Sequence, residues 1–411
     1  MFELLKRNRD FRALFVGQIV SYGGDWFALV ALLGVVTDAT HGSALAISGI
    51  FVAQMVPSFV LSPFAGPVAD RFNRRTVMIL SSLAAAVAAC GFLLVEPGRI
   101  WIAYVAQVLI SSLAAFFAPA AGAALANVVD PGDLPAAIRA SNSLWGIMLA
   151  VGAAVGAVFT QHFGRTASFV ANALSFALAA AVICLIRRPT NAPSTAVRAR
   201  VRPLADSREA VRYARQDPTL FAFLFAKGGV GLSGGVVALL TSLAIGRFHG
   251  GDGAVGVLLA ARGVGVVIGP LLAKRYTSGA TATILKVCAW SSVIYGAAYV
   301  GVSIAPALAL AAVGTCIAHL GGGNQWSLSA YGIQARSPDA FRGRMLAADM
   351  ALVMLASTVS FFVAAGLKEW LGTGAAMRIL GVLAVLWGFV YLRLTRSVRQ
   401  PAAGVSAASS T

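Results

Sequence analysis

The segment GPVADRFNRR, residues 66–75, lies between two apolar segments that are centred near Ala53 and Ala85. Three arginines and one acid within ten residues are too costly to bury in a membrane, so this segment must be a loop between spans. A similar segment, GPLLAKRY, occupies residues 269–276 in the second half of the chain. These two similar loops predict a protein with several membrane spans and an internal repeat.

Composition indicates a polytopic membrane protein. With 58% hydrophobic residues, 11% charged residues and a mean hydropathy of +0.81, the chain has too little polar surface to cover a soluble protein of 411 residues. A transmembrane helix needs about 20 apolar residues, and the sequence offers roughly twelve such segments. They are centred near Val20, Ala53, Ala85, Ser112, Gly152, Ser175, Gly231, Gly263, Tyr295, Thr315, Ser357 and Val385.

The basic residues predict the orientation. Of the 32 Lys and Arg, 25 lie in alternate connections beginning with the N-terminal one, 5 lie in the other connections, and 2 lie inside spans. Because positively charged loops stay in the cytoplasm, we expect both termini there, in the inner membrane of a bacterium. The net charge of +17 then reflects topology and contact with lipid head groups, and we expect no nucleic-acid partner. We expect the protein to be a monomer.

The two halves of the chain correspond to each other. Asp10 and Asp217 are 207 positions apart, as are Asn142 and Asp349, and Arg71 precedes Arg275 by 204. We therefore predict an all-α membrane protein in which twelve transmembrane helices form two pseudo-symmetric six-helix bundles. The expected boundaries are a first bundle at residues 1–187, a cytoplasmic linker at 188–217, a second bundle at 218–399 and a polar tail at 400–411.

These features resemble the major facilitator superfamily. In particular, residues 66–75 are similar to the signature loop of that family. Finer motifs are similar to the branch of enterobactin exporters and macrolide efflux proteins: NRDFR at 8–12, EAVRY at 209–213 and RGRM at 342–345. The resemblance implies a secondary transporter that works by alternating access, an efflux antiporter for a hydrophobic or amphipathic small molecule such as a drug or siderophore. It also implies proton exchange rather than a bound cofactor.

The resemblance assigns a gating role to the loop at residues 66–75. We expect Gly66 to let two helices approach closely and Asn73 to adopt a left-handed turn conformation. Asp70 would pair with arginine in one conformation and release it in the other; the alternative is an ordinary positively charged turn with an incidental acid. The expected gating residues are Gly66, Asp70, Arg71, Arg74 and Arg75.

Ionisable residues inside spans are rare and are therefore candidates for function. Asp25 lies halfway along the first span, and Gln18 shares its helical face. Lys227, Arg262 and Asp349 lie in spans seven, eight and eleven. Asp25 could exchange a proton during transport, or it could form a structural ion pair with Lys227 or Arg262 that locks the helices together.

Span ten contains further polar groups around three consecutive glycines at 321–323. Because glycine weakens a helix, we expect a break there that exposes backbone groups to a substrate. The expected substrate contacts are His319, Asn324, Gln325 and Trp326, with Gln107 of span four facing them; close helix packing is the alternative for each.

Other classes of protein fit the sequence less well. An intramembrane aspartyl protease would need Gly-x-Gly-Asp, whereas residues 22–25 read YGGD, so we expect no enzyme. No nucleotide-binding loop of the Walker type is present, and the four His are scattered without metal-ligand spacing, so we expect no metal or cofactor. An importer or a lysolipid transporter on the same scaffold remains the main alternative, ahead of a non-transporting membrane sensor.

Overall fold

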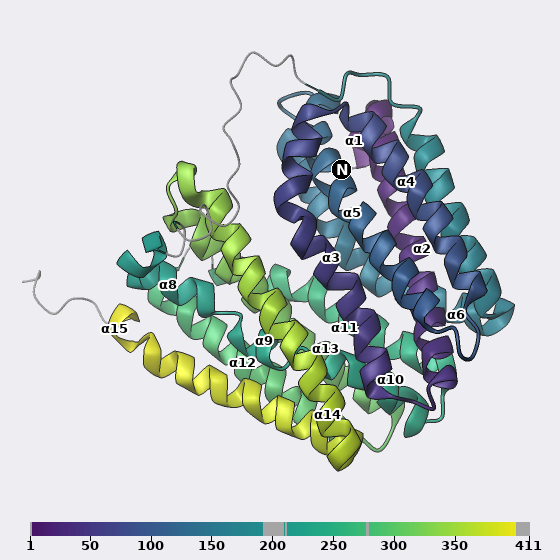
Figure 1. Cartoon of the computed structure of the whole chain (residues 1–411). Coiled ribbons are helices and arrows are strands. Elements are labelled where there is room, and N and C mark those ends of the chain that lie inside the picture. The colour runs from purple at the N-terminus through teal and green to yellow at the C-terminus, as the bar shows by residue number, and fades with distance from the viewer. Residues whose placement is uncertain (1, 192–208, 210–211, 277–278, 400–411) are drawn as a thin grey trace, which may run out of the picture.

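The computed structural model describes residues 2–191, 209, 212–276 and 279–399. Within these ranges the chain is helical and forms no strand, which confirms the predicted all-α fold. Figure 1 shows two helical bundles, the first built from α1 to α6 and the second from α8 to α15. The predicted tail at 400–411 and most of the predicted linker at 188–217 lie outside the described residues.

Side-chain caps mark the beginnings of the long helices in the first bundle. Asn8 Oδ1 accepts a hydrogen bond from the backbone N–H of Phe11 at 2.8 Å, and Ser43 and Asn73 cap the next helices in the same way. These side chains satisfy backbone groups that a helix start leaves without a partner. The helices are α1 (Phe2–Arg7), α2 (Arg9–Ala39), α3 (Ala44–Arg71), α4 (Arg74–Cys90) with the 3-10 turn η1 (Gly91–Leu94), α5 (Trp101–Val128) and α6 (Leu134–Ile183).

The second bundle begins at a similar cap, because Asp217 accepts hydrogen bonds from the backbone of Thr219 and Leu220. Its first span is divided into three short helices, whereas its other spans are long and continuous. The helices are α8 (Pro218–Phe225), α9 (Gly228–Leu232), α10 (Val236–Gly246), α11 (Gly251–Ala273) with η2 (Lys274–Tyr276), α12 (Thr281–Ile304), α13 (Leu308–Arg336), α14 (Asp339–Leu394) and α15 (Arg396–Arg399).

Backbone geometry repeats between the bundles. α6 contains a non-helical residue at Gly164, with φ of 83°, and α14 contains one at Gly372, with φ of 80°. Both positions need the positive φ that glycine adopts without steric cost, and they are 208 positions apart. His41 and His249 are also 208 apart and have φ of 50° and 49°. These pairs agree with the offsets that the sequence shows, although the side chain of Asn142 lies outside the described part.

The described helices agree with the predicted number of spans. Nine helical segments of the described residues are long and apolar enough to cross a membrane by length and composition, with α8 to α10 counted together as one segment. Two of these nine, α6 and α14, each contain two spans that are separated by Gly164 and Gly372. α13 has 29 residues, which also suffices to cross a bilayer. In this part of the chain the pattern is therefore consistent with twelve spans.

Apolar packing between the two bundles is concentrated toward one end of the described part of the molecule. One cluster of buried apolar side chains combines both bundles and includes Leu33, Phe51 and Leu239. Two further clusters each belong to a single bundle, one around Phe11 and the other around Phe223. In Figure 1 the bundles lie closest near α10 and diverge toward α8 and the N-terminus. We call these the joined end and the terminal end.

Small residues permit the contact between the bundles. A Cβ atom on Gly256 of α11 would overlap Ala157 of α6, and one on Gly263 would overlap the backbone of Ala150. On the neighbouring pair of helices, the rings of Phe51 and Phe361 stack with their centroids 5.4 Å apart. Glycine at these positions lets helices of different bundles approach at backbone distance.

Candidate functional site

Asp25 is the ionisable residue of the first bundle that lies within a span. Its side chain is partly exposed, and no residue in the described ranges forms a hydrogen bond or an ion pair with its carboxylate. Gly24 packs against Ser175 and Asn172 of α6, so the next residue, Asp25, lies on a different face of α2 from this contact. The buried Oε1 of Gln18 also has no hydrogen-bond partner in the described part. This face of α2 therefore carries polar groups that no described residue satisfies.

Lys227 and Asp349 form a buried ion pair within the second bundle. Their side chains are 2% and 1% exposed. The Lys227 ammonium also lies over the ring of Trp326, 4.5 Å from its centroid. The suggested pairing of Asp25 with Lys227 is therefore wrong, because Asp349 already occupies that amine. Asp349 Oδ1 has no hydrogen-bond partner among the described residues.

The helix break that the sequence suggested in span ten occurs in span seven instead. α13 continues through residues 321–323, whereas Ala226 and Lys227 separate α8 from α9. The amide of Gln325 donates to the carbonyls of Ala226 and Cys288. The predicted break at the three glycines is thus wrong, and Gln325 instead supports the actual break.

The glycines of α13 serve close packing. A Cβ on Gly321 would lie 2.6 Å from the carbonyl oxygen of Ser291 in α12, and one on Gly323 would lie 3.0 Å from that of Val266 in α11. The first distance is shorter than real side chains show and the second leaves almost no room, so α13 uses glycine to fit between α11 and α12. Helix weakness at these positions is offset by this packing.

Arg262 and His319 lie near two tyrosines. The Tyr299 hydroxyl and His319 Nε2 are 2.8 Å apart in a buried hydrogen bond. Arg262 interacts electrostatically with Tyr295 and Tyr299, but its buried Nε has no hydrogen-bond partner in the described part of the chain. The alternative that Arg262 pairs with Asp25 is not supported, since these described residues form no ion pair.

Two predicted substrate contacts form hydrogen bonds within their own bundle. Gln107 donates to Ser111 Oγ at 3.2 Å, one turn further along α5. Asn324 donates to Ser291 Oγ at 3.3 Å, while its Oδ1 is buried without a partner among the described residues. Asn324 thus keeps an acceptor free, as Gln18 does in the first bundle.

Two arginines of the loop at residues 66–75 hold the first bundle together. Arg74 Nε donates to the carbonyl of Ala69 at 3.1 Å, and its Nη1 donates to those of Ala123 and Thr190, also at 3.1 Å. Arg75 donates to the carbonyl of Cys184. These contacts connect α3 and α5 with the segment that follows α6.

Two predictions for this loop are wrong. A Cβ on Gly66 would meet no described atom within 4 Å, so no helix approaches there. Asn73 has φ of −64° and caps α4 instead of adopting a left-handed turn. Arg71 is exposed. The side chain of Asp70 lies outside the described part, so its gating role stays a prediction.

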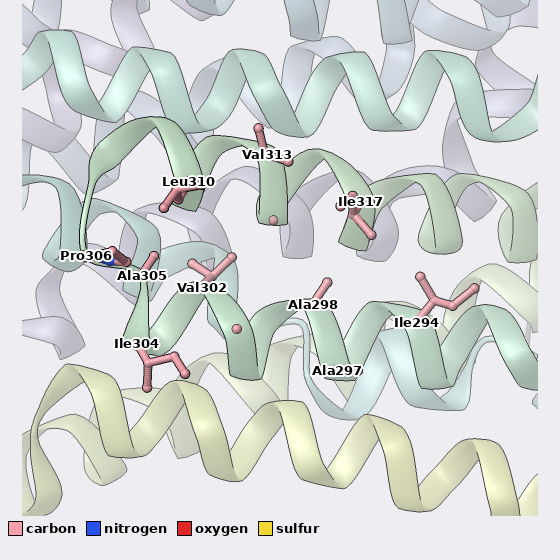
Figure 2. Close-up of a pocket in the computed structure, with 12 residues that line it drawn as sticks. Ile294, Ala297, Ala298, Val302, Ile304, Ala305, Pro306, Leu310, Val313 and Ile317 are labelled. Atoms are coloured by element: carbon pink, nitrogen blue, oxygen red, sulfur yellow. The ribbon is translucent and has the colours of Figure 1, made fainter.

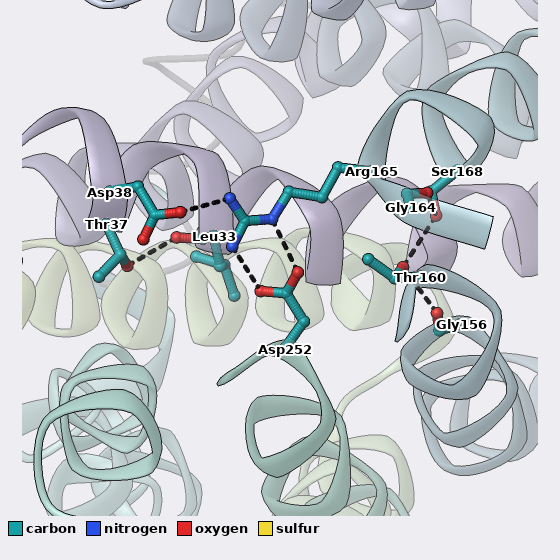
Figure 3. Close-up of polar contacts among 9 residues, drawn as sticks. All are labelled: Leu33, Thr37, Asp38, Gly156, Thr160, Gly164, Arg165, Ser168 and Asp252. Atoms are coloured by element: carbon teal, nitrogen blue, oxygen red, sulfur yellow. Dashed lines mark hydrogen bonds and ion pairs between the residues drawn. The ribbon is translucent and has the colours of Figure 1, made fainter. Parts of the chain in front are cut away.

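Sequence reasoning missed a cluster of charges at the joined end, which Figure 3 shows. The Arg165 guanidinium of the first bundle donates to Asp252 of the second, with Nε to Oδ2 at 2.7 Å and Nη2 to Oδ1 at 3.1 Å. Its Nη1 donates to Asp38 of its own bundle at 2.6 Å. A second bridge lies nearby, where Lys368 donates to the carbonyl of Gly42. The sequence does show these charges in the predicted outside loops, but it does not show which of them form ion pairs.

An apolar groove lies away from these polar groups. It runs between α12 and the beginning of α13 and is lined by side chains such as Ile294, Val302 and Leu310 (Figure 2). Ile294 and Leu310 are exposed apolar residues on spans, which is typical of a surface that contacts lipid. The groove contributes no chemistry to the candidate site.

The chain resembles known membrane transporters in sequence and in fold. A family model described as Major Facilitator Superfamily matches residues 14–285. An uncharacterized MFS-type transporter, YfiS of Bacillus subtilis, is 24% identical over 403 residues, which cover 95% of this chain and 94% of YfiS. Macrolide efflux protein A of Streptococcus pyogenes is 26% identical over 184 residues, 44% of this chain and 45% of that protein. The crystal structure of a POT family transporter with 5-aminolevulinic acid matches with a TM-score of 0.76 at 12% identity, covering 96% of this chain and 97% of that one. At that identity the structural likeness concerns the fold alone.

Proposed function

Because the chain belongs to the major facilitator superfamily of membrane transporters, we propose that it exports a hydrophobic or amphipathic small molecule, such as a drug or siderophore, in exchange for protons. The match to the family and to a macrolide efflux protein confirms the resemblance that the sequence motifs indicated. Export and substrate class are carried over from that relative and are part of the proposal.

The main observation in favour of proton exchange is that Asp25 has no ion-pair partner among the described residues. Asp38 marks the joined end of α2, and Asp25 lies thirteen residues before it. At a rise of 1.5 Å per residue this is about 20 Å along the helix, deep in a hydrocarbon core about 30 Å thick. A carboxylate at this depth without a partner among the described residues is stabilised by taking up a proton, and releasing that proton on the other side would drive export.

The distribution of the charged loops supports cytoplasmic termini, and the bacterial relatives support a location in a bacterial inner membrane. On this basis the terminal end of the molecule faces the cytoplasm, and the joined end faces outward. The apolar cluster shared between the bundles and the Arg165–Asp252 ion pair then close the outer side. This arrangement corresponds to the state that receives substrate from the cytoplasm.

Accumulation of amphipathic compounds in bacteria tests the proposal. We expect cells that produce the protein to accumulate less ethidium and less labelled erythromycin than cells with an empty vector. Asp25→Asn keeps the size of the side chain but cannot release a proton, so it should abolish this difference. Glu96→Gln, an exposed acid outside the spans, is the matched control and should export normally.

The possible outcomes separate the parts of the proposal. Export by Asp25→Asn at the normal rate across external pH would refute the role of Asp25 in proton exchange. Higher accumulation in cells that produce the protein would show that it imports these compounds and does not export them. Membrane levels of each variant, measured by immunoblot, control for loss of the protein.

A further inference from the structure

Arg262 is partly exposed and lies beside the contact between the bundles. Its neighbour Gly263 packs against the backbone of Leu149 and Ala150 in the first bundle. Ten residues separate Arg262 from Asp252, which binds Arg165 at the joined end. That separation is about 15 Å along α11, within about 5 Å of the depth of Asp25. Arg262 is therefore placed where an alternating-access transporter holds its substrate.

The described residues around Arg262 offer no negative charge. Among the described residues, no Asp or Glu forms an ion pair with it, and its buried Nε has no hydrogen-bond partner. The ionisable groups that act on it are Tyr295, Tyr299 and His319, none of which is an anion at neutral pH. Arg262 is partly exposed as a whole. A cation at this depth without a counter-charge is still unfavourable, so a ligand that supplies the anion would be bound tightly.

The neighbouring groups are held in a fixed arrangement. The rings of Tyr295 and Tyr299 pack edge to face with centroids 5.0 Å apart, and Tyr295 packs against His319 at 5.4 Å. The hydrogen bond between Tyr299 and His319 fixes the second ring. Such a cluster needs little reorganisation to receive a ligand, which lowers the entropic cost of binding.

We propose that Arg262, together with the hydroxyl of Tyr295, binds the anionic head group of an amphipathic substrate, either a carboxylate or a phosphate. A guanidinium presents paired N–H donors that match both oxyanions, and a tyrosine hydroxyl adds a further donor. Lys227 is not available for this role, because Asp349 already neutralises it. The claim that the bound anion is also transported rests on the proposed function, whereas the claim that it binds does not.

A matched series of fluorescent probes tests the site by binding alone. Dansylglycine carries a carboxylate, dansylamide is neutral and dansylcadaverine is cationic, while the fluorophore stays the same. Titrations use the purified full-length protein in nanodiscs of neutral phosphatidylcholine. We expect the wild-type protein to prefer dansylglycine over the other two probes.

Variants at position 262 separate charge recognition from general binding. Arg262→Gln should raise the Kd for dansylglycine by about tenfold or more and change the Kd for dansylamide by less than about twofold. Arg99→Gln removes the same charge from an exposed loop and should leave both values unchanged. Arg262→Lys, which keeps the charge, and Tyr295→Phe should each give a smaller loss that is specific to dansylglycine. These two variants still test the site if Arg262→Gln does not fold.

Displacement distinguishes the two sources of the anion. Release of dansylglycine by oleoyl lysophosphatidate but not by octanoate assigns a lipid head group, and release by octanoate assigns a small carboxylate. A wild-type protein without preference for dansylglycine overturns the site, as does an equal loss for all probes in the variants. Because no gradient is used, absent export together with specific binding would refute the proposed function and leave the site standing.

Discussion

Lys227 and Asp349 show what a satisfied pair of charges does inside a span. Their ion pair connects the junction of α8 and α9 with α14, and both side chains are almost fully buried. By contrast, Asp25 and Arg262 lie in different bundles without ion-pair partners among the described residues. The paired residues are suited to hold helices in place, and the unpaired ones are suited to bind ions or substrate. The sequence identified all four, because charges in apolar segments stand out, but it could not show which were paired.

Breaking the Lys227–Asp349 pair should destabilise the protein more than replacing it. Asp349→Asn leaves the buried ammonium without its anion, and we expect the free energy of unfolding to fall by about 3–5 kcal/mol. The double variant Lys227→Met/Asp349→Leu should recover most of this loss, since no charge remains buried. Thermal and denaturant unfolding of the purified protein in detergent measures both effects. Additive losses in the double variant would contradict this account.

At the scale of the elements, the sequence predicted the spans well and the helix break badly. Apolar length and charged connections are local properties, so segment centres such as Gly152 and Ser175 fall on either side of the turn at Gly164. The break depends on tertiary contacts. The glycines of α13 are kept helical by packing against α11 and α12, and Gln325 donates a hydrogen bond to the carbonyl of Ala226 at the junction of α8 and α9. Neither contact leaves a pattern within its own segment.

The cap of α8 should make stability depend on pH. Burial alone would raise the pKa of Asp217, but hydrogen bonds from the backbone N–H groups of Leu220 and Thr219 and the Arg336 guanidinium outweigh burial and hold this pKa below its usual value. A lowered pKa in the folded protein means that the ionised form contributes stability at neutral pH. That contribution is lost as the pH falls below the unfolded pKa of about 3.9 and through the folded one.

Asp217→Asn tests this contribution, because asparagine still caps the helix but carries no charge. We expect the variant to unfold at a lower temperature than the wild type at pH 7, equivalent to about 0.5 kcal/mol, and at the same temperature near pH 3. Differential scanning fluorimetry at both values measures the difference. Glu96→Gln, in an exposed loop, serves as the control and should show no such dependence. A difference that persists unchanged at pH 3 would exclude the charge as its cause.

At the scale of the whole molecule, the internal repeat predicted two bundles but not how they meet. Offsets of 207 positions within the sequence reflect duplication, which fixes the number and order of helices. Arg165 and Asp252 are 87 positions apart, and each looks like an ordinary charge in a short loop. Their contact exists only because α6 and α11 pack through Gly256 and Gly263. Contacts between bundles therefore required the structure.

Opening of the joined end should respond to the charge pair that crosses it. Asp252→Asn removes the charge that pairs with Arg165 between the bundles, whereas Asp38→Asn removes a charge that pairs with Arg165 within the first bundle, so the two variants are matched. We expect Asp252→Asn to shift the ratio of open to closed outer ends about fivefold, equivalent to about 1 kcal/mol for a partly exposed ion pair, and Asp38→Asn to shift it less. Spin labels at Leu45→Cys and Trp370→Cys, on opposite bundles, report the separation in a background without the four native cysteines. Both positions are exposed and lie next to the contact between Ala44 and Glu369. Equal distance distributions in the wild type and both variants would show that apolar packing alone holds this end closed. A longer distance in Asp252→Asn alone would show that the Arg165–Asp252 pair holds it closed.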